Sequence, residues 1–170
     1  MKSPIRHALA LVFTSSLGGC APESARPADH RAVIQARVEA SNAHDWDRWE
    51  SLHDPAACRV SPELAEPLCG ADVMRAAIEQ LVVAFPDYHL EIVDLVDDGD
   101  RLVVQMHTTG TMNGPLLIGD AEIPANGRTI EQDWVAIVEF SEENLITGFS
   151  EYYDQYILMV QLGLAPEFGP

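Results

Sequence analysis

The sequence predicts an α+β domain in which about three helices come first and an antiparallel sheet follows. Before residue 86, apolar side chains recur at helical spacing in three segments. From residue 88 onward the apolar period falls to two, in four segments that turn residues separate. Helices followed by consecutive antiparallel strands place the helices together on one face of the sheet.

Three segments have the sequence features of helices. The first, Asp29–Asn42, has a broad apolar stripe, and its aspartate is a suitable N-cap. The second, Asp45–Leu52, repeats an apolar residue at every third position. It includes two tryptophans, which we interpret as core residues rather than as a platform for a ligand. The third, Gly70–Phe85, has one continuous apolar face and ends before Pro86.

Four strands are predicted after the helices: Tyr88–Val96, Arg101–Thr111, Arg128–Phe140 and Leu145–Asp154. The apolar phase switches inside the first of them, which indicates a β-bulge and therefore a curved sheet. Two other segments are expected to lack regular structure. Ala57–Leu68 is broken by prolines, and Asn113–Asn126 is rich in glycine and proline.

The first nineteen residues have the pattern of an export signal. Lys2 and Arg6 supply positive charge, a short apolar run follows, and small residues precede Cys20. The apolar run is far shorter than the roughly 20 residues that span a bilayer. The pattern resembles a bacterial lipoprotein signal, in which the cysteine is lipidated and becomes the first residue of the mature protein. An ordinary cleaved secretory peptide is the alternative.

This interpretation divides the chain into four parts. Residues 1–19 are the expected signal peptide, residues 20–28 the lipidated cysteine with a polar tether, residues 29–164 the folded domain and residues 165–170 a C-terminal tail. The residue after the cysteine is Ala21 rather than an acid, which in bacterial lipoproteins argues against retention at the inner membrane. The protein is therefore expected at the outer membrane, facing the periplasm.

Cys58 and Cys69 are the cysteines that remain in the expected domain. In an oxidising compartment, two cysteines that enclose a proline-containing segment are typical of a disulfide, whereas in the cytosol they would be buried thiols. They are too few for a zinc site and lack accompanying histidines, so no metal is expected.

The formal net charge of −17 restricts the partners of the protein. A phosphate backbone would repel this chain, and its basic residues do not cluster, so no nucleic acid is expected as a partner. The same charge disfavours a polybasic contact with anionic lipid, so membrane contact is expected through the lipid anchor alone. The sequence lacks the motifs of serine hydrolases, zinc enzymes and nucleotide-binding enzymes, and no cofactor is expected.

The last predicted strand carries two acids, Glu151 and Asp154, beside aromatic residues. Partial burial raises the pKa of a carboxyl group, so such a group can accept and return a proton near neutral pH. The alternative for Asp154 is that it caps a helical turn that begins after the strand.

Several short strings along the chain occur together in one known family. They are Ala84-Phe85-Pro86-Asp87, Asp98-Gly99-Asp100-Arg101, Gly110-Thr111 with Gly114-Pro115, Pro124 with Gly127-Arg128, Tyr152 with Asp154, and Gln161-Leu162-Gly163-Leu164. In this order they resemble the SnoaL-like polyketide cyclases of the nuclear-transport-factor-2-like superfamily, over roughly Asp29–Leu164. The resemblance implies a curved antiparallel sheet wrapped around the helices as a cone, with a pocket in its mouth.

The resemblance also implies a catalytic carboxylate. In cyclases of the family, a pocket carboxylate acts as acid and base in an intramolecular aldol closure, without metal or cofactor. This role falls on Asp154, whereas related epoxide hydrolases place an acid nearest Glu151. Residues 151 and 154 lie on opposite faces of a regular strand, so at most one is expected in the pocket unless the strand has ended. We prefer Asp154, where the strand is expected to have ended.

Four further residues are candidates for the site. His107 is predicted either to stabilise an enolate or to be a partly buried histidine with a neighbouring partner. Tyr152 and Phe149 are predicted to line the substrate site, and Tyr152 to donate to the developing oxyanion. Asp133 is predicted either to bind substrate or to be a solvated strand end.

Three functions are consistent with these residues. The preferred hypothesis is a cofactor-free acid/base enzyme, a cyclase, isomerase or hydrolase, that acts on a small apolar carbonyl compound. The first alternative is a non-catalytic lipoprotein that binds a hydrophobic small molecule. The second is an interaction domain that dimerises through the open face of its sheet, since homodimers are common among the family.

Overall fold

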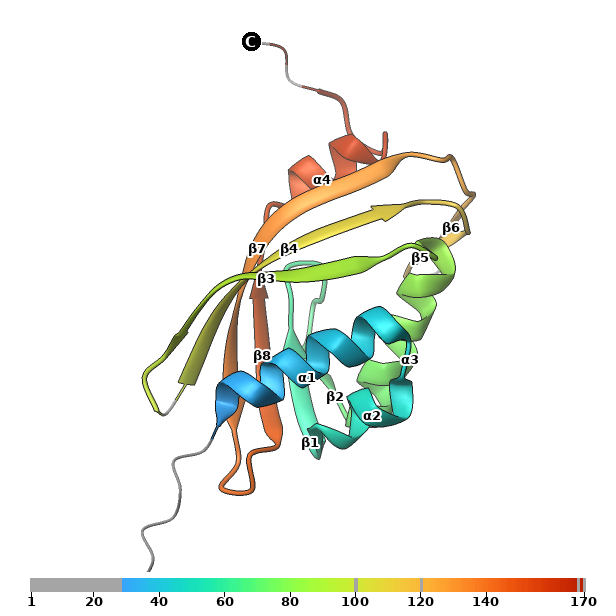
Figure 1. Cartoon of the computed structure of the whole chain (residues 1–170). Helices are drawn as coiled ribbons and strands as arrows, with labels where there is room; N and C mark the ends of the chain where they lie inside the picture. Colours follow the sequence, from blue (N-terminus) through green and yellow to red (C-terminus); the bar gives the residue numbers. More distant parts are fainter. Residues whose placement is uncertain (1–28, 100, 120, 168, 170) are drawn as a thin grey trace, which may run out of the picture.

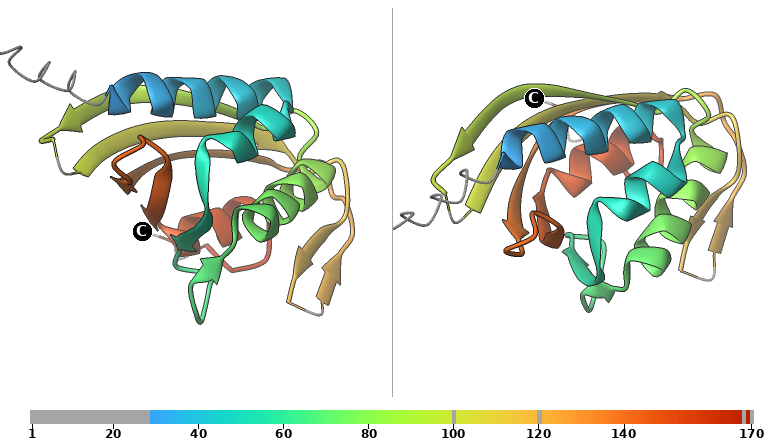
Figure 2. Two further views of the ribbon diagram at one scale, coloured as in Figure 1. Left: turned by 90° about the horizontal axis from the view of Figure 1, so that it is seen from below. Right: turned by 60° about the horizontal axis from the view of Figure 1, so that its bottom comes forward.

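The computed structural model describes residues 29–99, 101–119, 121–167 and 169. Its main element is a six-stranded sheet that curves around the three N-terminal helices (Figure 1, Figure 2). The predicted α+β class is confirmed, but two strands, β1 and β2, lie between the second and third helices rather than after all three.

The elements have the following bounds. The helices are α1 (His30–Ala43), α2 (Trp46–Ser51), α3 (Ala71–Ala84) and α4 (Gln155–Gln161). The strands of the main sheet, from one edge to the other, are β2 (Leu68–Cys69), β1 (His53–Val60), β8 (Ile146–Tyr152), β7 (Thr129–Phe140), β4 (Arg101–Thr111) and β3 (His89–Asp97). A separate hairpin consists of β5 (Leu116–Ile118) and β6 (Ala121–Ile123).

The three predicted helices are confirmed, together with the side-chain caps that begin two of them. The carboxylate of Asp29 accepts a hydrogen bond from the backbone N–H of Ala32 at 3.1 Å. The carboxylate of Asp45 accepts one from the backbone N–H of Arg48 at 3.1 Å. Each cap satisfies a backbone donor that the first turn of a helix leaves unpaired.

The four predicted strands are confirmed, but the expectation of irregular structure around Ala57 is wrong. Strand β1 runs on to Val60 and pairs in parallel with β8, where Arg59 lies opposite Phe149. The proline in this strand, Pro55, falls in the interval where the register shifts, and there it interrupts no regular ladder. The segment predicted as a loop between β4 and β7 likewise contains the β5–β6 hairpin.

Strand β3 contains the predicted bulge. Ile92 pairs with Met106 and Asp94 pairs with Gln105, so Val93 has no partner on β4. An extra residue on one strand bends that strand and increases its twist. The bulge therefore contributes to the curvature that gives the sheet a concave side, along which α1 lies (Figure 2).

The main core lies between α1 and this concave side. Alternate residues of β4, namely Leu102, Val104 and Met106, are fully buried and belong to one cluster with Ile34 of α1 and Phe149 of β8. The concave side is therefore the buried face of the sheet, and the intervening residues of each strand face outward.

Two predictions about α2 and β1 are confirmed. Trp49 is 2% exposed and forms a second cluster with Ala40, Ala57 and Met74, against which Trp46 packs, as expected for core tryptophans. Cys58 and Cys69 form a disulfide that joins β1 to β2.

The expected signal peptide, residues 1–19, and the expected lipidation site at Cys20 with its tether lie outside the described residues. Within the part of the chain that the structure describes, no helix is long and apolar enough to cross a membrane.

Candidate functional site

The register of β8 determines which predicted site residues face the helices. Across β7, Phe149 pairs with Val138 and Glu151 pairs with Ala136. Phe149, Val138 and Ala136 belong to the core that α1 covers, so Glu151 faces the same concave side. The side chain of Glu151 is 10% exposed.

His107, Asp133 and Tyr152 lie on the opposite, convex side of the sheet. His107 stands between the buried Met106 and Thr108 of β4 and pairs directly with Asp133 of β7, and Tyr152 is 58% exposed. The Nδ1 atom of His107 lies 2.7 Å from the carboxylate of Asp133, and this hydrogen bond raises the pKa of His107. The structure thus brings His107 and Asp133 together, but on the face away from Glu151.

Asp154 follows the end of β8 and caps α4. Its carboxylate accepts a hydrogen bond from the backbone N–H of Ile157 at 3.0 Å, and its own carbonyl accepts one from the side chain of Gln132 at 2.9 Å. The alternative interpretation of Asp154, as a helix cap, is confirmed. Its role in proton transfer stays a prediction, and that role would require the carboxylate to leave this cap.

Glu151 belongs to a network of charged groups on the concave side. Arg59 of β1 donates two hydrogen bonds to its carboxylate, at 3.0 Å from Nε and 2.8 Å from Nη2. The Nη2 group also donates to Glu63 at 2.6 Å, so one guanidinium is shared by two carboxylates. Glu63 accepts further hydrogen bonds from the hydroxyl groups of Ser61 and Tyr153.

The pKa shifts in this network follow from the pairing. Burial alone would lower the pKa of Arg59, but the hydrogen bond and charge of Glu151 raise it. Burial would raise the pKa of Glu63, but the charge of Arg59 and the hydrogen bond from Ser61 lower it. Arg59 and Glu63 are therefore both ionised at neutral pH.

A second arginine, Arg37 of α1, lies deeper in the same interior and is 5% exposed. Its guanidinium carbon stands 4.0 Å from the centre of the Phe149 ring and 5.2 Å from that of Trp49. Its Nε donates to Nε2 of His53 at 3.4 Å, and Nδ1 of His53 lies 2.8 Å from the carbonyl oxygen of Trp49. Since an arginine only donates, His53 accepts at Nε2 and donates from Nδ1.

Electrostatics keep this pair in one charge state. Burial, followed by the charge of Arg37, lowers the pKa of His53 to about 3. Burial lowers the pKa of Arg37 to about 10, and the charge of Glu151 opposes that change. At neutral pH, Arg37 is therefore a buried cation next to a neutral histidine.

Tyr88 lies beside a hydrogen bond between two neighbouring strands. The indole N–H of Trp134 donates to the hydroxyl oxygen of Thr108 at 2.7 Å, and Thr108 acts to lower the pKa of Tyr88. Burial, with the charge of Glu151, raises the pKa of Tyr88 to about 12. Tyr88 is thus a neutral phenol that can donate a hydrogen bond.

Comparison with known families identifies this arrangement of sheet and helices. The profile of the family described as SnoaL-like polyketide cyclase matches residues 31–162. The chain belongs to this family. No curated protein matches the sequence.

Solved structures share this fold. A protein from Jannaschia sp. CCS1, named as a SnoaL-like polyketide cyclase, shares 18% identity with a TM-score of 0.70, over 81% of this chain and 93% of that one. TsrD from Streptomyces laurentii shares 27% identity at a TM-score of 0.67, over 79% of this chain and 95% of TsrD. A protein with a ketosteroid isomerase-like fold from Catenulispora acidiphila, solved with trimethylamine, shares 14% identity at a TM-score of 0.64. The match covers 81% of this chain and 97% of that one.

This SnoaL-like chain contains site residues that sequence reasoning missed: Arg37, His53, Arg59, Glu63 and Tyr88. One signal was available for the first of them. Arg37 lies on the apolar stripe of the first helix, between Ile34 and Val38, where a charged side chain must be buried. Nothing local marks Arg59, because its partner Glu151 is brought to it only by the parallel pairing of β1 with β8.

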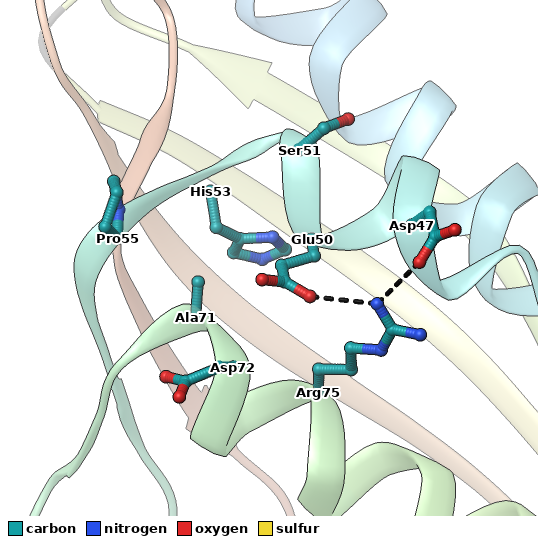
Figure 3. Close-up of a pocket in the computed structure, with 8 residues that line it drawn as sticks. All are labelled: Asp47, Glu50, Ser51, His53, Pro55, Ala71, Asp72 and Arg75. Carbon is teal, nitrogen blue, oxygen red and sulfur yellow. Dashed lines mark hydrogen bonds and ion pairs between the residues drawn. The ribbon is translucent and has the colours of Figure 1, made fainter.

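An open cleft of about 600 Å³ lies on the outer side of this network, between α2 and α3 (Figure 3). Arg75 crosses it and is 2.7 Å from Asp47 and 3.0 Å from Glu50. His53 also lines the cleft, but it is 3% exposed and both of its ring nitrogens are engaged. The cleft therefore reaches the back of the Arg37–His53 pair without exposing it.

A second cleft, of about 320 Å³, lies on the convex side and is lined by His107, Glu131, Gln132, Asp133 and Gln161. Within the described ranges, no group of three or more histidine, cysteine or acidic side chains is arranged to hold a metal ion.

Proposed function

We propose that the protein is a cofactor-free enzyme that transfers a proton at a carbon next to a carbonyl group, with Glu151 as its acid and base. The observation that carries this proposal is the position of Glu151 on the concave side. There it shares Arg59 with Glu63 and lies on the same face as Phe149. The core residues on this face are aromatic and aliphatic, which suits a small and mostly apolar compound.

The shared arginine explains how Glu151 can act as a base. A carboxylate held by a guanidinium is usually a weak base, because the ion pair favours the ionised form. Arg59 has a second carboxylate, Glu63, so it keeps an ionised partner when Glu151 takes up a proton. Glu63 also accepts hydrogen bonds from Ser61 and Tyr153. Protonation of Glu151 therefore breaks fewer hydrogen bonds than protonation of Glu63 would.

The proposed step is a simple proton transfer. The bond between the α carbon and its hydrogen breaks, the proton goes to a carboxylate oxygen of Glu151, and the electron pair moves onto the carbonyl oxygen to form an enolate. In an isomerase, Glu151 returns the proton to another carbon. In a cyclase, the enolate carbon bonds to a second carbonyl carbon, and the oxygen of that carbonyl takes the proton back.

Hydrogen–deuterium exchange tests this function without knowledge of the natural substrate. A panel of aryl and alicyclic ketones is incubated with the protein in D₂O, and exchange at the α carbon is followed by NMR. We expect exchange above the buffer rate, and a loss of about 100-fold or more in Glu151→Gln, as for removal of a general base.

Two matched variants serve as controls. Glu139→Gln changes an exposed glutamate on the neighbouring strand β7 and should leave the exchange rate unchanged. Asp154→Asn should also leave the exchange rate unchanged. Exchange that survives Glu151→Gln but is lost in Asp154→Asn would return the role to Asp154.

A binding protein for a hydrophobic small molecule is the second candidate. It is favoured by the full engagement of the Glu151 carboxylate, both of whose oxygens accept hydrogen bonds from Arg59. A protein that binds ketones but exchanges none of them, with binding that survives Glu151→Gln, would support this candidate and exclude the enzyme.

We also propose that the protein acts outside the inner membrane, anchored by a lipid at Cys20. The pattern of residues 1–19 supports this, as does the disulfide between Cys58 and Cys69, which suits an oxidising compartment. Labelled palmitate should be incorporated by the wild-type protein and not by Cys20→Ser. Labelling of that variant, or a wild-type protein found in the cytosol, would contradict the proposal.

A further inference from the structure

Arg37 differs from the other arginines that the structure pairs. Arg48, Arg59 and Arg75 each lie within 4.0 Å of at least one carboxylate. Arg37 has no ion pair among the described residues, although the chain contains 27 acidic and 10 basic residues. In so acidic a protein, a buried arginine without a carboxylate is unusual.

The orientation of the Arg37 guanidinium is fixed, but its hydrogen bonding is incomplete. Nε is held by His53, which is itself held by the carbonyl of Trp49, and the guanidinium lies over the ring of Phe149. Nη1 is buried and has no hydrogen-bond partner in the part of the chain that is described. A buried charged donor without an acceptor destabilises a fold, so an acceptor from outside the chain is expected here.

Tyr88 is a neighbouring polar group in the same interior. Burial and the charge of Glu151 raise the pKa of its phenol to about 12, against the opposing charge of Arg37, so Tyr88 is neutral near neutral pH. Tyr88 packs against the core cluster that contains Phe149, whose ring Arg37 covers.

We propose that Arg37 binds a ligand oxygen, which carries a negative charge or gains it in the reaction. The ligand class is a carbonyl compound with an apolar body that is bound as its enolate. Four charged groups balance one another here, of which Arg37 and Glu151 lie deepest and Arg59 and Glu63 lie nearer the surface. When a proton moves from the ligand to Glu151, negative charge leaves the carboxylate and arrives on the oxygen, where Arg37 compensates it. This last step rests on the proposed function, whereas binding of a preformed enolate does not.

A stable enolate tests the site directly. The probe is 5-phenylcyclohexane-1,3-dione, which is an enolate at neutral pH, and its uncharged 3-methoxy enol ether is the matched ligand. Calorimetry on the purified protein should show tighter binding of the enolate. Arg37→Met should weaken enolate binding about 30-fold, with little effect on the ether. Arg48→Met, the same change at a surface arginine, should change neither.

The outcomes separate this inference from the proposed function. Three results would each overturn the role of Arg37 and leave a buried water as the partner of Nη1. They are equal affinity for enolate and ether, no binding of the enolate at millimolar concentration, and unchanged affinity in Arg37→Met. If Arg37→Met does not fold, Arg37→Lys supplies the test, because it keeps the charge but lacks the planar guanidinium to which Nη1 belongs. Enolate binding that depends on Arg37, in a protein that exchanges no α hydrogen, would refute the enzyme but support this site.

Discussion

On the concave face of the sheet, Glu151 of β8 pairs with Arg59 of β1; on the convex face, Asp133 of β7 pairs with His107 of β4. Each pair joins an acid and a base across two neighbouring strands. The first pair has side chains that are 10% and 23% exposed, and the second has side chains that are 64% and 29% exposed. The pairs thus differ less in residue type than in access to water.

Exposure to water determines how much each ion pair contributes to stability and how strongly its charges act on neighbouring groups. An ion pair on the surface is screened by solvent and contributes little to stability. A buried pair cannot lose one partner without leaving an uncompensated charge, and its charges act strongly on neighbours such as Arg37 and Tyr88. For this reason the concave pair is the candidate for chemistry, and the convex pair is a surface feature that responds to pH.

The largest expected effect comes from removal of Arg59. Arg59→Met leaves the half-exposed Glu63 and the nearly buried Glu151 without their shared partner, and should lower the free energy of unfolding by about 3 kcal/mol. Urea denaturation at neutral pH measures this change. Protonation of the two carboxylates relieves the repulsion between them, so the deficit should shrink as the pH falls.

A matched substitution on the surface sharpens the comparison. Arg48 pairs with Glu39, and their side chains are 45% and 55% exposed. Arg48→Met should therefore cost less than about 0.5 kcal/mol. Equal losses in the two variants would show that burial does not separate the Arg59 network from surface pairs.

The same distinction marks what could be predicted from sequence. Helices and strands were predictable because the periodicity of apolar residues and the caps at Asp29 and Asp45 are local signals. The face to which Glu151 points depends on register with β7, and its partner Arg59 depends on a parallel strand far away in sequence. Neither the register nor the parallel pairing is marked by a short sequence motif. Glu151 could therefore be predicted as a candidate acid from its strand, but its environment could not be predicted.

His107 and Asp154 are residues that were predicted for the site although local sequence signals indicated another position or role. Both were chosen because residue type and position in the chain suited acid/base chemistry. His107 follows the alternation of β4, in which residues 102, 104 and 106 face the core, so its outward position could have been inferred from the same alternation. Asp154 sits directly before an apolar helical segment, where capping is the common role of an aspartate.

A smaller effect is expected at this helix cap. Asp154→Ala removes the acceptor for the backbone N–H of Ile157 and should lower the free energy of unfolding by about 1 kcal/mol, while the rate of hydrogen–deuterium exchange in ketones stays at the wild-type value. Asp154→Ser, which retains a capping oxygen, should recover most of the stability. A loss of exchange activity in both variants, without a loss of stability, would place Asp154 in the chemistry.

The smallest effect is expected at the convex pair. The hydrogen bond from His107 to Asp133 raises the pKa of His107 in the folded protein above its ordinary value of 6.5. A raised pKa in the folded state means that the stabilisation is fully present below the pKa of the unfolded chain, and is lost as the pH rises through the folded pKa. Asp133→Asn should therefore be less stable than the wild-type protein below pH 6.5, and the difference should fade at higher pH.

An NMR titration of the His107 ring provides the direct measurement. Its apparent pKa should lie above 6.5 in the wild-type protein and fall in Asp133→Asn, while Glu151→Gln, on the other face of the sheet, should leave it nearly unchanged. Glu131 and Glu91 also face His107 and contribute to its raised pKa, so part of the increase should survive in Asp133→Asn. A His107 pKa that followed Glu151 rather than Asp133 would mean that the sheet does not insulate its two faces. The convex pair would then have to be treated as part of the interior network.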